Sequence, residues 1–276
     1  MTLFASRWGF AIIGGSLLTA LLGVFAFNTM LAGVRLGVVG LLTGGAGGGI
    51  LTAIALLDRR TRVIRKDVRK GILETRAMTN IRPLLENGPL DVGGWALPAE
   101  TCERLVHEIR TRRPKTIVEC GSGASTVLMA ACLRTYGIDG KIISLDHEAT
   151  YAQSTRDQLQ QQSLSQYATV VTAPLSPLTV AGKRLDWYDF DPDEHLEATV
   201  DLLLVDGPPW DTGEMARFPA VPVLKQHLSS DCFILLDDGK RSDETKVAEE
   251  WGQMLQLHEA KLSGNYKPFW TFVPRA

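Results

Sequence analysis

The sequence predicts an α/β fold: a doubly wound, mostly parallel sheet of seven strands that ends in an antiparallel hairpin, preceded by two transmembrane helices. Three observations lead to this prediction. Short apolar runs alternate with helical patterns from residue 116 onward. A glycine turn, Gly121-Ser122-Gly123, directly follows the first run, and two long uncharged stretches come before residue 58. Strands that alternate with helices favour a parallel sheet with helices on both faces.

The two uncharged stretches predict a transmembrane hairpin at residues 1–58. They run from Phe10 to Phe27 and from Leu36 to Leu57, joined by Asn28 to Arg35. At about 1.5 Å of rise per residue, the second stretch is about 33 Å long as a helix, which is enough to cross a hydrocarbon core. A cleaved signal peptide is the alternative for the first stretch, but the second stretch and its basic flank argue against it.

A basic segment follows the hairpin and sets its orientation. Seven Lys and Arg side chains lie between residues 59 and 70, against Asp67 alone, whereas the link inside the hairpin carries only Arg35. The positive-inside rule therefore places the N-terminus and everything after residue 58 in the cytoplasm, with the basic segment near anionic lipid headgroups. We interpret Gly44–Gly49 as a site of close helix packing, because a phosphate loop would need a following Lys-Ser or Lys-Thr.

Composition limits the partners of the remaining chain. Residues 1–70 hold nine of the 29 Lys and Arg but two of the 31 Asp and Glu, which leaves 20 basic and 29 acidic side chains in the rest. This acidic balance argues against a nucleic-acid partner. The four cysteines show no metal-site spacing and are expected to be reduced and buried. They are Cys102, Cys120, Cys132 and Cys232.

The predicted elements of the α/β domain follow in order. Residues 59–87 form a basic juxtamembrane helix or linker, with a helical pattern from 63 that Gly88-Pro89 ends, and the domain spans 88–276. The expected helices are 98–112, Ser125–Thr135, Thr150–Gln162, Ala216–Leu228 and Asp243–Leu255. The expected strands are Thr116–Glu119, Lys141–Leu145, Ala168–Thr172, Asp201–Val205 and Cys232–Leu236, then the hairpin Leu255–Ala260 and Phe269–Val273. A long irregular stretch is expected between Thr172 and Asp201.

Glycine and acidic residues end several of these strands, so one edge of the sheet is the expected binding site. These residues are Glu119, Gly121, Gly123, Asp146, Asp206 and Asp237. A dinucleotide fingerprint would have Gly or Ala at position 126, where this chain has Thr126. Asp146 at a strand end suits the ribose hydroxyls of NAD or of S-adenosylmethionine (SAM). The alternative is that Glu119 and Asp146 are solvated acids.

The motifs resemble one known family. IVECGSGASTVLMA, IISLDHEATYA, VDLLLVDGPPW, ARFPAVPVL and FILLDDGKRSDE resemble class I SAM-dependent methyltransferases, whose sheet is Rossmann-like. The preceding GGWAL segment, residues 93–97, is similar to a bacterial branch of that family. The resemblance covers residues 88–276 and implies that the membrane is a bacterial plasma membrane. It also implies cofactor contacts. Glu119, Gly121, Gly123 and Ser125 would hold the methionine part, Asp146 the ribose, His147 the adenosine and Ala173 the adenine.

A second cluster of acids raises the question of a metal. Asp206 ends one predicted strand, and Asp237 and Asp238 end its neighbour, about 5 Å away. Close carboxylates repel unless a cation joins them, and an all-oxygen set suits Mg²⁺. The pattern is similar to catechol-type O-methyltransferases, which have Asp-Asn for the pair and a catalytic Lys where this chain has Pro209. The alternative is that Asp206 orients the substrate and Asp238 caps the next helix.

Further residues are candidates for catalysis and substrate binding. Besides Asp206, the candidate bases are Lys240 and Asp211. Arg217 and Arg241 are candidates for an anionic substrate group, or for surface ion pairs with Glu214, Asp243 and Glu244. Trp210 is a further substrate candidate. The aromatic run 187–190 is interpreted either as a lid over the substrate or as an anchor for its loop.

The sequence therefore predicts a membrane-anchored SAM-dependent methyltransferase, with magnesium as a candidate second cofactor. The expected acceptor is a glycan, a lipid-linked sugar or a related small metabolite, methylated on oxygen. Membrane lipid is the other expected partner, and a homo-oligomer is among the states that the sequence allows. An NAD-dependent oxidoreductase is an alternative, although no Tyr-x-x-x-Lys motif is present. A non-catalytic membrane scaffold with the same fold is another, which Pro209 favours.

Overall fold

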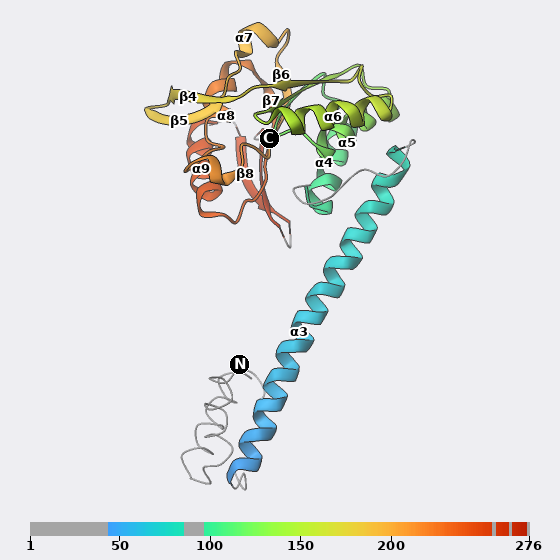
Figure 1. The fold of residues 1–276 in the computed structure, drawn as a ribbon, viewed down its shortest axis with the longest axis vertical. Helices are drawn as coiled ribbons and strands as arrows, with labels where there is room; N and C mark the ends of the chain where they lie inside the picture. Colours follow the sequence, from blue (N-terminus) through green and yellow to red (C-terminus); the bar gives the residue numbers. More distant parts are fainter. Residues whose placement is uncertain (1–43, 86–96, 256–257, 265–266, 275–276) are drawn as a thin grey trace. The chain divides into compact units, whose positions relative to one another are not determined.

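The computed structural model describes residues 44–85, 97–255, 258–264 and 267–274 (Figure 1). The chain divides into two compact units, Met1–Gly71 and Ile72–Ala276. The division lies inside the predicted linker 59–87. Most of the GGWAL segment and both ends of the chain lie outside the described residues.

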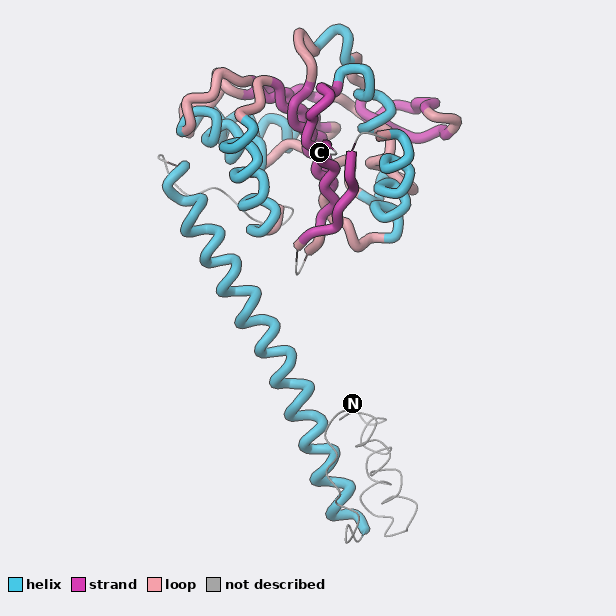
Figure 2. The backbone as a smooth tube through the Cα atoms, turned by 180° about the vertical axis from the view of Figure 1, so that it is seen from behind, coloured by secondary structure: helices cyan, strands magenta, loops and turns pink. Residues whose placement is uncertain are grey.

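Helix α3 (Gly44–Ile81) contains the described part of the predicted membrane hairpin. Figure 2 shows it as one continuous helix. The segments 10–27 and 36–43 lie outside the described residues. Within the described ranges, no helix is long and apolar enough to cross a membrane. The second membrane helix and the juxtamembrane helix were expected to be separate, whereas Gly44 to Ile81 form one helix. It ends where Pro83 enters the short 3₁₀ helix η1 (Arg82–Leu84), because proline lacks the donor that an α-helix needs.

A seven-stranded sheet forms the centre of the second unit, in the order β3-β2-β1-β6-β7-β9-β8. The first five strands of this order are parallel, and β9 is antiparallel to both of its neighbours. The strands are β1 (Thr116–Cys120), β2 (Lys141–Asp146), β3 (Ala168–Thr172), β6 (Val200–Val205), β7 (Leu228–Leu236), β8 (His258–Ser263) and β9 (Phe269–Pro274). This confirms the predicted sheet and its terminal hairpin, although β7 starts at Leu228 and β8 at His258.

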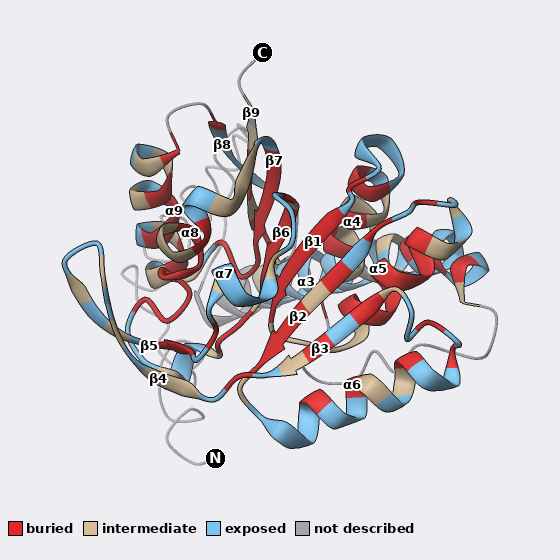
Figure 3. Cartoon of the chain, turned by 90° about the horizontal axis from the view of Figure 1, so that it is seen from above, coloured by how far each residue is buried: buried red, intermediate tan, exposed pale blue. Residues whose placement is uncertain are grey.

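Helices cover both faces of the sheet. The first face packs on α4 (Ala99–Arg112), α5 (Ala124–Thr135) and α6 (Ala149–Gln161), and the second on α8 (Ala220–Leu224) and α9 (Ser242–Met254). Successive residues of β1 alternate between the two cores, with Ile117 in the first and Val118 in the second. Figure 3 shows the central strands buried between these layers. All four cysteines are buried free thiols, as expected.

Two predicted elements were wrong. The stretch after β3 is not irregular: β4 (Leu175–Val180) and β5 (Lys183–Tyr188) pair as an antiparallel hairpin, followed by the short helix α7 (Pro192–His195). Its turn, Ala181-Gly182, takes positive φ at both residues, which suits a tight hairpin. The predicted helix 216–228 is reduced to α8 and the 3₁₀ helix η3 (Lys225–His227). Pro219 directly precedes α8 and removes a backbone donor where a longer helix would need one.

Candidate active site

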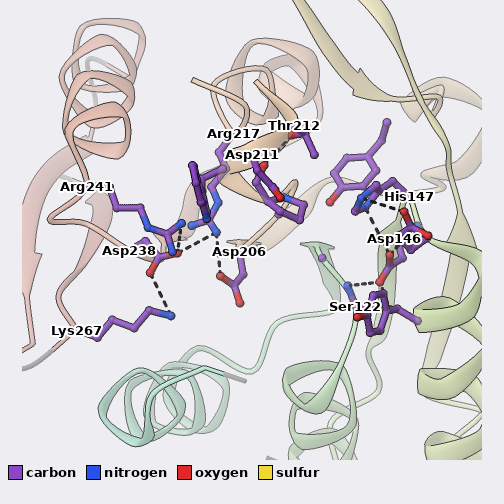
Figure 4. Close-up of a pocket in the computed structure, with 17 residues that line it drawn as sticks. Ser122, Asp146, His147, Asp206, Asp211, Thr212, Arg217, Asp238, Arg241 and Lys267 are labelled. Atoms are coloured by element: carbon purple, nitrogen blue, oxygen red, sulfur yellow. Dashed lines mark hydrogen bonds and ion pairs between the residues drawn. The ribbon is translucent and has the colours of Figure 1, made fainter. Parts of the chain in front are cut away.

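A cavity of about 650 Å³ opens at the carboxyl ends of the central strands. Figure 4 shows Ser122, Asp146 and His147 on one side of it, and a charged group around Asp238 on the other. Most lining residues come from the ends of β1, β2, β6 and β7 and the loops after them, with one residue from α6, one from β5 and one preceding β9. The lining residues are Gly121, Ser122, Asp146, His147, Glu148, Tyr151, Tyr188, Asp206, Gly207, Pro209, Trp210, Asp211, Thr212, Arg217, Asp238, Arg241 and Lys267. The predicted edge of the sheet is thus where the cavity lies.

Two glycine turns meet at the floor of this site. Gly121 has a φ of +96°, and a Cβ atom there would lie 3.1 Å from the backbone nitrogen of Gly207. The amides of Asp206 and Gly207 both donate to the carbonyl of Cys120, at 3.0 and 2.7 Å. The loops after β1 and β6 are therefore in backbone contact, and a side chain at Gly121 would separate them.

Glu119 organises the glycine turn from behind. It is fully buried, it is not among the residues lining the cavity, and its carboxylate accepts hydrogen bonds from Ser125 (2.5 Å), Thr126 (2.5 Å) and Ser144 (2.6 Å). The Thr126 hydroxyl also accepts from the amide of Gly123 at 3.0 Å. Thr126 and Ser125 thus bind the acid rather than line the cavity. Burial raises the pKa of Glu119 to about 7, although the three hydrogen bonds act in the opposite direction and lower it.

This raised pKa predicts a pH-dependent contribution to stability. Because the Glu119 pKa rises from its ordinary value of 4.5 to about 7 on folding, the folded state holds the proton more tightly. Glu119 therefore favours folding below about pH 4.5, and this contribution is lost as the pH rises to about 7. Glu119→Gln keeps the shape and removes the charge. Between pH 5 and pH 8, we expect the melting temperature of the variant to fall less than that of the wild type. An equal fall in both would contradict this expectation.

Asp146 is held at the other side of the cavity. It is 5% exposed, and its Oδ2 accepts from the Ser122 hydroxyl at 2.6 Å and from the Ser122 amide at 3.2 Å. Its Oδ1 accepts from the amide of Glu148 at 3.0 Å. Asp146 is thus fixed between the loops after β1 and β2, and His147 lines the cavity beside it. Ala173 is buried and, like Gly123, is not among the lining residues.

The three aspartates proposed for a metal do converge. One carboxylate oxygen from each of Asp206, Asp237 and Asp238 lies within 4.8 Å of the others. Burial raises the pKa of Asp206 well above its ordinary range, and the charge of Asp237 raises it further. Neighbouring acids in such a site need positive charge nearby.

Basic side chains supply that charge. Arg217 Nη2 lies 3.3 Å from Asp206 Oδ1 and 3.1 Å from Asp238 Oδ2. Lys267 Nζ lies 2.8 Å from Asp237 Oδ2 and 3.1 Å from Asp238 Oδ1, and Arg241 Nη1 lies 2.8 Å from Asp238 Oδ2. The ammonium group of Lys267 thus joins two of the three proposed ligands. These three basic side chains do not fit a Mg²⁺ site. Their positive charges would repel the ion, and they already bind the carboxylate oxygens that would coordinate it.

These contacts also define the roles of Asp238 and the two arginines. Asp238 does not cap the following helix, since the N-cap of α9 is Arg241, without a side-chain cap bond. Arg217 is only 4% exposed and is bound by partly buried Asp206 and buried Asp238, so it is neither a surface ion pair with Glu214 nor a free clamp for substrate. Arg241 is partly exposed and lines the cavity while it binds Asp238.

The three candidate bases occupy different positions. Asp206 lines the cavity beside the glycine turns. Asp211 is exposed in the 3₁₀ helix η2 (Trp210–Thr212), where Trp210 is 59% exposed, and both line the cavity. Lys240 is exposed and is not among the lining residues, so its predicted role as base finds no support.

Lys267 and Tyr188 are among the lining residues that were not singled out from the sequence. Lys267 comes just before β9, and nothing in its neighbourhood of the sequence indicated a role. Tyr188 belongs to the aromatic run that was interpreted as a lid or an anchor. Trp187 and Phe190 are buried and anchor the segment, whereas Tyr188 lines the cavity. The hairpin β4–β5, which brings Tyr188 to the site, was itself missed.

Comparison with known proteins agrees with this architecture. A family described as a methyltransferase domain matches residues 118–239, from β1 to the loop after β7. The fold of this chain is similar to that of the SAH-bound methyltransferase PaMTH1 of Podospora anserina, with a TM-score of 0.52 at 12% identity, covering 78% of this chain and 96% of that one. It is also similar to cofactor-bound Rv0187 from MTB, with a TM-score of 0.50 at 17% identity, covering 72% and 90%. No curated protein matches the sequence.

The family match and the sheet topology support the enzyme class that the motifs predict, a SAM-dependent methyltransferase. The prediction of the enzyme class from the motifs is therefore confirmed.

Proposed function

We propose that this protein is a membrane-anchored O-methyltransferase of the cytoplasmic face of a bacterial plasma membrane. The proposed acceptor is a hydroxyl of a glycan, a lipid-linked sugar or a related small metabolite. The observation that supports oxygen as the target is Asp206, a cavity carboxylate with a raised pKa beside the two glycine turns. The uncharged runs before residue 58 and the basic segment after it support the anchor.

The residues divide the cavity between donor and acceptor. SAM would lie over the turns after β1 and β2, where Asp146 can accept hydrogen bonds from its ribose hydroxyls. The acceptor would enter beside Trp210, whose exposed ring offers an apolar face of the kind on which sugar rings pack. The acceptor hydroxyl then lies between Asp206 and the methyl group of the donor.

Methyl transfer needs one proton transfer and one displacement. Asp206 takes the proton of the acceptor hydroxyl, and the oxygen attacks the methyl carbon in line with the sulfur. The bond from sulfur to that carbon breaks and leaves S-adenosylhomocysteine (SAH), a neutral thioether. A carboxylate with a raised pKa is a stronger base than an ordinary aspartate. Positioning of the two substrates supplies most of the remaining acceleration.

The magnesium hypothesis is not part of this proposal. Arg217, Arg241 and Lys267 already neutralise the carboxylates that would bind the ion. We therefore expect about 5 mM EDTA to leave the rate of methyl transfer unchanged within about twofold. Loss of transfer in EDTA, restored by Mg²⁺, would contradict this assignment.

The proposal is tested by supplying methyl-labelled SAM to the full chain together with a membrane extract. We expect label in a lipid or glycan fraction, in a bond stable to mild alkali as an ether is, with equal production of SAH. Label in a protein or nucleic-acid fraction would contradict the acceptor class. Binding of SAM without any SAH formation would favour a non-catalytic membrane scaffold.

A further inference from the structure

Tyr188 carries a buried hydroxyl that forms no hydrogen bond with any residue in the described part of the chain. The residue ends β5, is 3% exposed and lines the cavity. Among the described residues, no donor or acceptor bonds its Oη. Most buried hydroxyls in folded proteins have a partner, so one that lacks it at a cavity wall is placed to bond a ligand.

The position of this hydroxyl indicates which end of the cavity it serves. A Cβ atom added at Gly207 would lie 2.4 Å from Tyr188 Oη, and Gly207 in turn contacts Gly121. The hydroxyl therefore lies beside the two glycine turns, where the methionine part of SAM is expected. The ring of His147, on the side expected for adenosine, lies with its centroid 6.4 Å from that of Tyr188.

The chemistry of the hydroxyl indicates which ligand atom it can bond. Burial raises the pKa of Tyr188 well above its ordinary value, so the phenol keeps its proton and can donate it in a hydrogen bond. The ribose hydroxyls of SAM would donate to Asp146. The methionine carboxylate is the strongest remaining acceptor on the donor, and a charged acceptor strengthens the bond.

We propose that Tyr188 Oη donates a hydrogen bond to the methionine carboxylate of bound SAM, so that the hairpin β4–β5 completes the donor site. This assignment rests on the proposed function only in requiring that the cavity binds SAM. It also gives a reason for glycine at position 207, since a side chain there would meet the tyrosine hydroxyl.

Calorimetric titration of the full chain, purified in mild detergent, tests this contact with two probes. SAH carries the carboxylate, whereas 5′-methylthioadenosine keeps the adenosine and the sulfur but lacks the amino-acid part. We expect Tyr188→Phe to lower the affinity for SAH about tenfold to a hundredfold, which is the usual loss when a hydrogen bond to a charged group is removed. Its affinity for 5′-methylthioadenosine should stay within about twofold of wild type. Equal losses for both probes, or no loss for SAH, would overturn the proposal.

Thermal unfolding without ligand separates this role from a structural one. Because none of the described residues bonds this hydroxyl, Tyr188→Phe should melt at the wild-type temperature or above it. A clearly lower melting temperature would mean that the free protein already bonds the hydroxyl, and would also overturn the proposal. Tyr167→Phe, a matched change at a partly buried tyrosine that is not a lining residue, should leave the affinities for both probes unchanged. If wild-type protein binds neither probe, the proposed function fails instead.

Discussion

Asp206→Asn is expected to lower methyl transfer by about 10²- to 10⁴-fold, the range typical for loss of a general base. The amide is nearly the same size as the carboxylate but cannot take the proton of the acceptor hydroxyl. Asp206 lines the cavity beside the Gly121 and Gly207 turns, where the acceptor and the methyl group would meet. Affinity for SAH should stay within about threefold, because the base acts on the acceptor and not on the donor. The rate of SAH formation and calorimetric titration measure the two effects.

Asp211→Asn is the matched control, since Asp211 also lines the cavity but is exposed. It should lower the rate far less than Asp206→Asn. A larger loss at Asp211 would transfer the role of base to that residue.

The pH profile gives a second test of the same base. Transfer requires ionised Asp206, and burial raises its pKa well above the ordinary range. The rate should therefore increase with pH, and its acidic limb should lie well above the range of an ordinary aspartate. A rate that is already constant above about pH 5 would contradict a base with a raised pKa.

Arg217→Met is expected to lower the free energy of unfolding by about 3–5 kcal/mol, the cost of removing one partner from a buried ion pair. Its guanidinium contacts Asp206, Asp238 and the backbone carbonyl of Asp237, and the residue is 4% exposed. Methionine fills much of the same volume, but the carboxylates lose their charge partner. Denaturant unfolding of the full chain, followed by tryptophan fluorescence, measures the difference. The matched change Lys246→Met breaks an exposed ion pair with Glu214 and should leave stability nearly unchanged.

The deficit of Arg217→Met should grow as the pH rises. Arg217 lowers the pKa of Asp206, so its removal raises that pKa further. A carboxyl whose pKa is raised on folding favours the fold at low pH and loses this contribution as the pH rises. The variant should therefore lose more stability at pH 8 than at pH 5. An equal deficit at both values would mean that Arg217 acts through packing alone.

The parallel core of the sheet was predictable because its signals are local. Buried strands such as β1 and β2 are apolar runs that end at glycine or an acid, and their predicted bounds differ from the observed ones by a single residue. The hairpin β4–β5 was missed because Pro177 and several polar residues interrupt the apolar pattern. Proline disfavours a central strand, but β4 pairs with β5 alone, in a separate two-stranded sheet.

The candidate site was predictable where strand order alone brings residues together. Asp206 and Asp238 meet because β6 and β7 are neighbours in the sheet. Lys267 and Tyr188 reach the cavity only because the segment before β9 and the hairpin β4–β5 pack beside it. The residues next to them in the sequence give no sign of this packing. The same missing contacts made the aspartates look like a metal site, since the cations that neutralise them are distant in sequence or were assigned to the substrate. In the sequence, Thr126 argued against a dinucleotide-binding fingerprint. In the structure, its hydroxyl donates a hydrogen bond to Glu119.

The central claim is that this cavity binds SAM and releases SAH. Calorimetric titration of the full chain with SAH and, separately, with NAD tests it most directly. We expect one SAH per chain, an affinity within about tenfold of micromolar, and no heat with NAD. Tight binding of NAD without binding of SAH would contradict the claim.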